Sequence, residues 1–163
     1  MAIHKIDGVD AVDGGSIISH FPKKFVTLRA NEAVTKGYWV AIDVSDTTNG
    51  LGSGVKHANS GDGDASTIFG VATASADAGA NVRVQTAGKF GDIGAFVQAD
   101  TAAGEGLVCS AVEGQATQGD TDPGDEFTDV GFALAADATG TDDSGTAVAA
   151  NYAHVMIRDQ GLF

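Results

Sequence analysis

The residue types that commonly perform chemistry are present in this sequence, but their spacing matches no catalytic or metal-binding motif. No two histidines lie four residues apart, as two metal ligands on one helix face would. The four histidines are His4, His20, His57 and His154. No serine lies in the Gly-x-Ser-x-Gly pattern of a nucleophile elbow, and the glycine-rich residues 50–54 lack the lysine and helix of a phosphate-binding loop. We therefore expect a protein that is not an enzyme and that uses no cofactor.

Two acidic segments could supply oxygen ligands to Ca²⁺, because this cation prefers carboxylates and carbonyls. One contains Asp62 and Asp64, and the other contains Asp120 and Asp122. Neither segment has the final glutamate or the flanking helices of the twelve-residue calcium loop. We therefore expect solvated acidic loops and no metal site, with these four aspartates as weak candidates. A hydrolase with paired carboxylates stays as an alternative that no second element supports.

Cys109 is the sole cysteine, so no disulfide can form within the chain. It lies in the apolar residues 106–109, where we expect a small buried side chain, because a redox cysteine needs basic neighbours. The first 15 residues lack the basic segment and apolar core of a signal peptide. No stretch approaches the roughly 18 apolar residues of a membrane span. We expect synthesis in a reducing cytoplasm and no membrane partner.

The net charge of −13 is distributed unevenly along the chain. Residues 1–56 contain six Lys or Arg and six Asp or Glu, whereas residues 57–163 contain three and sixteen. The resulting negative field repels phosphate backbones, so we expect no direct nucleic-acid binding. The acidity serves either solubility or an outward face that must not adhere to DNA, membranes or other copies of the chain.

One segment near the N-terminus combines basic and aromatic residues in an otherwise acidic protein. The candidate contact residues are Phe21, Pro22, Lys23, Lys24, Phe25 and Arg29. They are either an ordinary strand entry or a surface that docks onto an acidic or mixed protein partner.

From residue 25 onward, apolar residues recur with a period close to two, which predicts an all-β protein. The 23 glycines and 2 prolines indicate that its turns are made mainly by glycine. Strands are predicted at 25–30, 38–44, 67–73 and 80–86, with residues 88–90 ending the first unit. Long exposed loops are predicted at 45–66 and 113–128. An arm with a short strand at 16–21 is predicted for residues 1–24.

The same order of elements recurs, which predicts two tandem copies of one small β unit. Residues 30–40 align without gaps over residues 99–109, and residues 69–72 match 130–133. The turn 77–79 matches 143–145, and residues 153–157 close the second unit. Single matched residues are Ala30/Ala99, Ala33/Ala102, Gly37/Gly106 and Val82/Val148. We predict an arm at 1–24, a first unit at 25–92 and a second at 93–163, and the two units could pack as one domain. Similarity by composition alone is the alternative.

Four short motifs in the first unit resemble an element of small capsid decoration (cement) proteins of tailed phages. They are Phe69-Gly70-Val71-Ala72, Asp77-Ala78-Gly79, Val82-Arg83-Val84 and Gly88-Lys89-Phe90. Residues 30–40 are similar to the preceding hairpin of those proteins. The duplication, the acidic loops and the arm depart from that family.

The resemblance implies a small β-barrel or β-tulip-like fold and, after synthesis in the host cytoplasm, a position on the outer capsid surface of a virion. It implies a structural role without catalysis, in which the protein binds the major capsid protein and stabilises contacts between capsomers. Such proteins form symmetric clusters, so we expect self-association as a homotrimer, with a homodimer as the alternative. A non-viral or fibre-associated, adhesin-like β module that binds glycans is the competing hypothesis, although its aromatic residues, Tyr38, Trp39 and Tyr152, are few.

Overall fold

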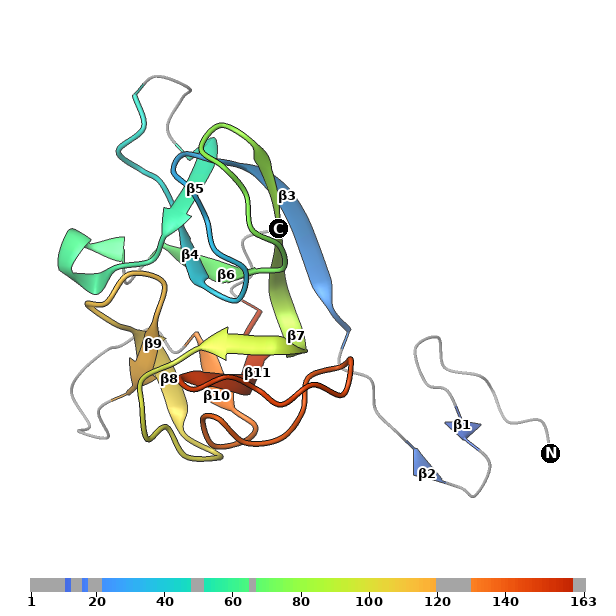
Figure 1. The fold of residues 1–163 in the computed structure, drawn as a ribbon. Coiled ribbons are helices and arrows are strands. Elements are labelled where there is room, and N and C mark those ends of the chain that lie inside the picture. Colours follow the sequence, from blue (N-terminus) through green and yellow to red (C-terminus); the bar gives the residue numbers. More distant parts are fainter. Residues whose placement is uncertain are drawn as a thin grey trace.

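The computed structural model describes residues 11–12, 16–17, 22–47, 52–64, 67–119 and 130–159. The fold is all-β, as predicted, and one 3₁₀ helix, η1 (Ser60–Asp62), lies among the described residues (Figure 1). The strands are β1 (Ala11–Val12), β2 (Ser16–Ile17), β3 (Lys24–Ala30), β4 (Trp39–Ile42), β5 (Gly54–His57), β6 (Ile68–Ala72), β7 (Asn81–Phe96), β8 (Gly106–Cys109), β9 (Ala116–Gln118), β10 (Gly131–Ala133) and β11 (Tyr152–Ile157). β1 and β2 pair only with each other in this description. Within these ranges, no helix is long and apolar enough to cross a membrane.

Five strands form a closed barrel, which we call the first barrel. Its order is β3-β5-β4-β6-β7, and β3 also pairs with β7 to close the ring. β3 is parallel to β5 and antiparallel to the first half of β7, from Asn81 to Ala87. Closure gives each strand of the barrel a neighbour on both sides, which reduces the unpaired edges that act as templates for aggregation.

The second half of β7 starts a further group of strands, which we call the second sheet. Residues Gly88 to Phe96 pair with β11, and the order continues β11-β10-β8-β9. An isolated parallel bridge joins Val97, directly after β7, to Ala116 of β9. The long strand β7 therefore belongs to both halves of the molecule, and Figure 1 shows the second sheet below the first barrel.

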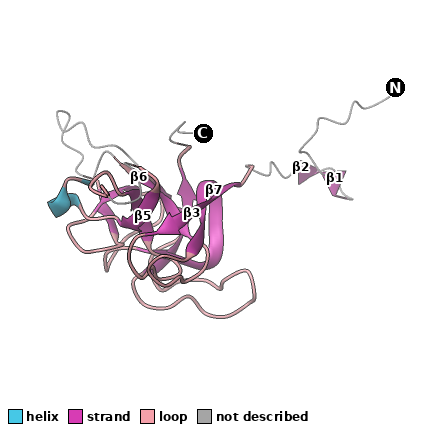
Figure 2. Ribbon diagram, turned by 90° about the horizontal axis from the view of Figure 1, so that it is seen from above, coloured by secondary structure: helices cyan, strands magenta, loops and turns pink. Residues whose placement is uncertain are grey.

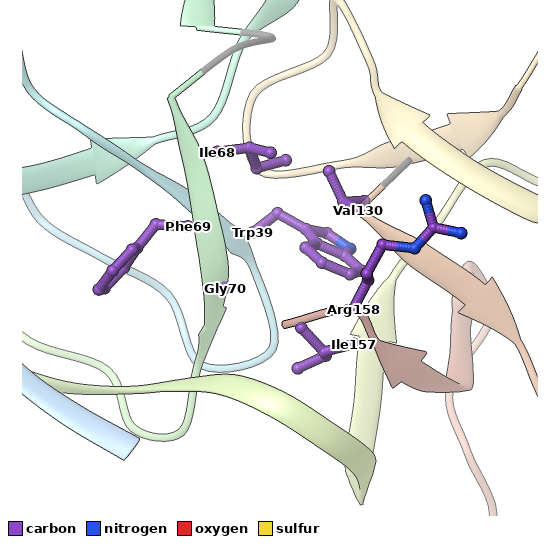
Figure 3. A pocket seen from close by; sticks show the side chains of 7 residues that line it. All are labelled: Trp39, Ile68, Phe69, Gly70, Val130, Ile157 and Arg158. Carbon is purple, nitrogen blue, oxygen red and sulfur yellow. The ribbon is translucent and has the colours of Figure 1, made fainter. Parts of the chain in front are cut away.

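Two apolar clusters fill the molecule, and β4 contributes to both because its side chains alternate. Val40 lies in the interior of the first barrel with Phe69 and Val84. Trp39 and Ala41 point the other way and pack with residues of the second sheet, including Phe90, Leu107 and Val155. Figure 3 shows Trp39 and Ile68 on one side of β6 and Phe69 on the other. An apolar run such as residues 39–42 is typical of a strand buried on both faces.

Several predicted boundaries are wrong. The loop predicted at 45–66 contains β5 and η1, and the loop predicted at 113–128 contains β9; residues 120–129 lie outside the described part. β7 does not end at residues 88–90 but continues to Phe96. Strands this short have little periodicity of their own and depend on partners far away in sequence.

The predicted boundary between residues 92 and 93 falls inside β7, and one apolar cluster joins residues of both predicted units. Ser16 and Ile17 form a strand within the predicted arm, whereas residues 18–21 lie outside the description. Cys109 is 8% exposed, as predicted for a small buried side chain. Burial, followed by the charge of Asp64, raises the pKa of its thiol to about 11, so the reactive thiolate is scarce at neutral pH.

Replacing Trp39 with alanine should strongly destabilise the protein. Trp39 is fully buried where β4 faces the second sheet, and truncating a buried aromatic costs about 3–5 kcal/mol. Urea denaturation should show this loss, whereas Val112→Ala, at a 53% exposed valine, should change the unfolding free energy by about 0.5 kcal/mol or less. Equal losses in the two variants would contradict the assigned role of Trp39.

Candidate interaction surface

The outward face of β3 and β7 carries an aromatic and basic group of side chains. Phe25, Thr27 and Arg29 alternate with the inward Val26 and Leu28. The antiparallel register places Arg83 of β7 opposite Thr27. The Arg83 guanidinium carbon lies 3.9 Å from the centre of the Phe25 ring, which is a cation–π contact, and Phe25 is 38% exposed. This contact presents an apolar ring and a cation together to solvent.

Cations concentrate on this side of an acidic molecule. Five of the nine Lys and Arg residues lie on β3, on β7 or directly before β3: Lys23, Lys24, Arg29, Arg83 and Lys89. The Nζ atom of Lys24 is 2.5 Å from a carboxylate oxygen of Asp159, and that of Lys23 is 3.9 Å from Asp143. Exposed ion pairs of this kind contribute roughly 0–1 kcal/mol each, so a partner could displace these acids at little cost.

A shallow cavity of about 200 Å³ lies beside Lys24. It is lined by Pro22, Lys24, Ala87, Gly88, Met156, Ile157 and Asp159. The cavity forms where β3 begins, β7 bends and β11 ends. Pro22, Lys23, Lys24, Phe25 and Arg29 of the predicted contact set are thus gathered on or near one face, whereas Phe21 lies outside the described residues.

The bend of β7 positions this face, and Gln85 is the residue that stabilises it. Its side chain is 3% exposed, and Nε2 lies 3.0, 3.3 and 3.0 Å from the carbonyl oxygens of Ala87, Gly88 and Lys89. The buried amide group of Gln85 thus provides a hydrogen-bond donor to carbonyl oxygens at the bend, where the regular ladder between strands is interrupted. Sequence reasoning missed Gln85; its one signal was a polar side chain between the apolar Val84 and the glycine-containing motif at 88–90.

Gly88 is required at this bend for two reasons. Its φ of +86° lies in the left-handed region, and a Cβ atom there would be 2.9 Å from the carbonyl oxygen of Pro22 and 3.2 Å from the Cα of Lys23. The bend of β7 and the start of β3 are therefore in backbone contact.

The described aspartates that were candidate calcium ligands lie away from the β3–β7 face. Asp62 lies in η1, which Figure 2 shows on the side away from β3 and β7. Asp64 is 2% exposed, and its Oδ2 lies 3.3 Å from the Nζ of Lys56. Burial acts to lower the pKa of Lys56, but the hydrogen bond and charge of Asp64 outweigh it and the pKa is raised. Among the described residues no three His, Cys, Asp or Glu side chains form a metal-binding group; Asp120 and Asp122 lie outside the description.

A row of aromatic rings forms a second surface feature, on the side of β4 and β11. The rings of Tyr38 and Phe96 stack with centroids 4.7 Å apart. The ring centroids of Phe96 and Tyr152 are 5.5 Å apart, and these two rings are tilted. A cavity of about 290 Å³ borders Tyr152 and contains Ile93, Asp142 and Thr146 in its wall. Burial, with a smaller contribution from Tyr38, raises the pKa of Tyr152, so its hydroxyl stays protonated. Trp39, which the sequence analysis named with Tyr38 and Tyr152 for the glycan-binding hypothesis, is buried.

The fold of this chain is similar to that of a phage head protein. The solved structure is that of the head fiber gp8.5 N base in bacteriophage phi29, with a TM-score of 0.52 and 20% sequence identity. The match covers 85% of this chain and 96% of that chain. No family model matches the chain, and no curated protein matches it in sequence. At 20% identity the likeness is one of fold, and the resemblance to decoration proteins remains a prediction.

Gly88→Ala should destabilise the protein more than Gly104→Ala. Both glycines have positive φ, +86° and +90°, so both substitutions carry the left-handed penalty of about 1–2 kcal/mol. Only at Gly88 would the new methyl group press on backbone atoms, because no atom lies within 4 Å of a Cβ at Gly104. Thermal unfolding of the two variants measures the difference; equal melting temperatures would show that β3 does not pack against the bend.

Asp43→Asn should reduce the acid sensitivity of the protein. The side-chain hydrogen bond from Ser45 lowers the pKa of Asp43 against the opposing effect of burial, and Asn31 adds a further bond of 2.9 Å. A carboxyl whose pKa is lower in the folded state stabilises the fold above its unfolded pKa of about 3.9. This stabilisation is lost as the pH falls through the folded pKa. Unfolding curves from neutral to acidic pH should show a lower starting stability and a flatter decline in the variant.

Proposed function

We propose that this chain is a structural protein of a phage virion that binds the outer surface of the assembled head. The observation that carries the proposal is the exposed Phe25–Arg83 pair on the β3–β7 face of a chain whose net charge is −13. The likeness in fold to a head fiber base supports it. No catalytic step is required, because the role is mechanical.

The proposed mechanism is docking of one face with the correct orientation. The acidic remainder of the molecule repels an acidic shell, whereas the cationic face attracts it, so the protein approaches with β3 and β7 foremost. Phe25 then supplies the apolar contact that excludes water, and Arg83 and Lys24 pair with carboxylates of the major capsid protein. Contact across neighbouring capsomers stabilises the shell by linking them.

A second candidate function rests on the aromatic row. Tyr38, Phe96 and Tyr152 form a continuous set of rings beside a cavity with polar groups, which is the chemistry of a sugar-binding platform. An adhesin-like module that binds glycans through these rings is therefore the alternative, and it uses a different surface from that of the head contact.

Charge reversal at Arg83 should weaken binding to heads. Phage heads assembled without this protein would be mixed with it and sedimented, and we expect Arg83→Glu and Phe25→Ser each to raise the apparent Kd about tenfold or more. The controls are Lys36→Glu, at a cation that pairs with Asp92 beyond the bend of β7, and Val112→Ser. Binding by the wild type should also weaken as salt increases.

Two outcomes would contradict the proposal. Wild-type protein that stays wholly in the supernatant would show that it does not bind heads. Equal binding by Arg83→Glu and Lys36→Glu would show that the β3–β7 face is not the contact. Binding to a glycan array that is lost in Tyr152→Ala, together with no binding to heads, would favour the second candidate function.

A further inference from the structure

Strand β3 has a paired neighbour on both sides only at its end. β7 pairs with it from Lys24 to Arg29, whereas β5 pairs with it only at Arg29 and Ala30. Figure 1 shows β5 beside the end of β3 and not beside its start. On the β5 side, the residues from Lys24 to Leu28 therefore pair with no strand in the described part of the chain. We call this stretch the open edge.

Backbone hydrogen bonds at the end of β3 show which of its residues face which neighbour. Ala30 N donates to Ala80 O at 2.8 Å, on the side of β7. Asn31 N donates to Val55 O at 2.9 Å, on the side of β5. Backbone groups alternate between the two sides of a strand, so the even-numbered residues of β3 bond toward β7 and the odd-numbered residues point toward β5.

The same alternation determines which backbone groups lie at the open edge. Val26 and Leu28 lie in one unbroken register with β7 and carry the hydrogen bonds to it. The N–H and C=O groups of Phe25 and Thr27 point the other way, where the described residues offer them no hydrogen-bond partner. Both residues are exposed. These groups are thus available to another strand, and a row of such groups is the usual site of strand addition.

The side chains along the open edge differ in character between its two faces. On the outward face, Thr27 lies opposite Arg83 and is followed on that face by Arg29. On the side of the barrel interior, Val26 and Leu28 pack against the core but are only partly buried. A strand added at the open edge would therefore meet cations on one face and cover apolar surface on the other.

Arg83 gives the open edge its charge. The net charge of the chain is −13, yet no carboxylate of the described residues forms an ion pair with Arg83. Its guanidinium carbon lies 3.9 Å from the centre of the Phe25 ring. Because Phe25 belongs to β3, this cation reaches across from β7 to the strand that carries the open edge. The charge complementary to it is that of a carboxylate.

We propose that the open edge of β3 binds an extended acidic segment of the major capsid protein as an added strand. The proposal rests on the proposed function and states how the partner chain is held. Main-chain hydrogen bonds with Phe25 and Thr27 supply the pairing, and the side chains of the segment supply specificity. Successive side chains of a strand point to opposite faces. The segment therefore alternates acidic residues, toward the two arginines, with apolar residues, toward the barrel interior.

Thr27→Pro tests the strand addition without disturbing the ladder to β7. Proline has no N–H group and is tolerated on a strand edge where that group faces solvent. In sedimentation with phage heads assembled without this protein, we expect Thr27→Pro to raise the apparent Kd about tenfold. The matched control, Thr27→Ala, keeps the N–H group and should bind as the wild type does. Val26→Pro should instead lower the melting temperature strongly, because it removes a hydrogen bond to β7.

Amide hydrogen exchange of the wild type tests the same pairing even if Thr27→Pro does not fold. In the free chain, the amides of Phe25 and Thr27 should exchange fast, whereas those of Val26 and Leu28 should exchange slowly. On phage heads, exchange at Phe25 and Thr27 should slow about tenfold or more, as expected for amides that enter a ladder. Mass spectrometry with fragmentation to single residues measures both states.

Photo-crosslinking identifies the bound segment. A chain with p-benzoylphenylalanine in place of Phe25 would be irradiated on phage heads, and the crosslinked peptide would be sequenced by mass spectrometry. We expect a peptide of the major capsid protein in which acidic and apolar residues alternate. A crosslinked peptide without acidic residues would contradict the proposed partner.

The outcomes separate this proposal from the proposed function. If Thr27→Pro folds and binds heads as Thr27→Ala does, while Arg83→Glu binds weakly, the face contacts heads but strand addition is excluded. A wild type that does not bind heads would refute both. Slow exchange of the Phe25 and Thr27 amides in the free chain would show that the edge is already occupied, and would also exclude the added strand.

Discussion

The structure depends on the bend of one strand. β7 closes the first barrel with its first half and begins the second sheet with its second half, so both cores are aligned by a single stretch of backbone. The bend is stabilised by the buried amide of Gln85 and requires glycine at position 88. Because Gly88 contacts the chain at Pro22 and Lys23, the same bend also determines where β3 starts and therefore which side chains form the cationic face.

The two halves are held together by side chains that alternate along β4 and β6. Val40 and Phe69 fill the first barrel, whereas Trp39, Ile68 and Val71 fill the space between it and the second sheet. A barrel wall that is apolar on both faces cannot be exposed to water on either side. The halves are thus obliged to pack together.

The longer strands and the all-β class followed from the sequence because periodicity is a local property. β5 and β9 did not, because residues such as Lys56 and His57 have no apolar alternation and become strands only through distant partners. Similarly, the basic residues from Lys23 to Arg29 were visible as a cluster, but Arg83 and Gln85 join them only through the β3–β7 register. The ungapped alignment paired Gly37 with Gly106, but Gly104 is the glycine whose amide donates to Ala133 as that of Gly37 donates to Ala72, and a sequence alone does not show such hydrogen bonds.

The contact between Lys24 and Asp159 has a mechanical consequence. These residues lie at opposite ends of the described core in sequence, yet their side chains meet at one corner. Tension applied between the two ends would therefore load this exposed ion pair together with the start of β3, because Lys24 is the first residue of that strand and pairs with Ala87. The pulling force would thus act at this one corner of the core, and the exposed ion pair would add little resistance beyond that of the β3–β7 ladder.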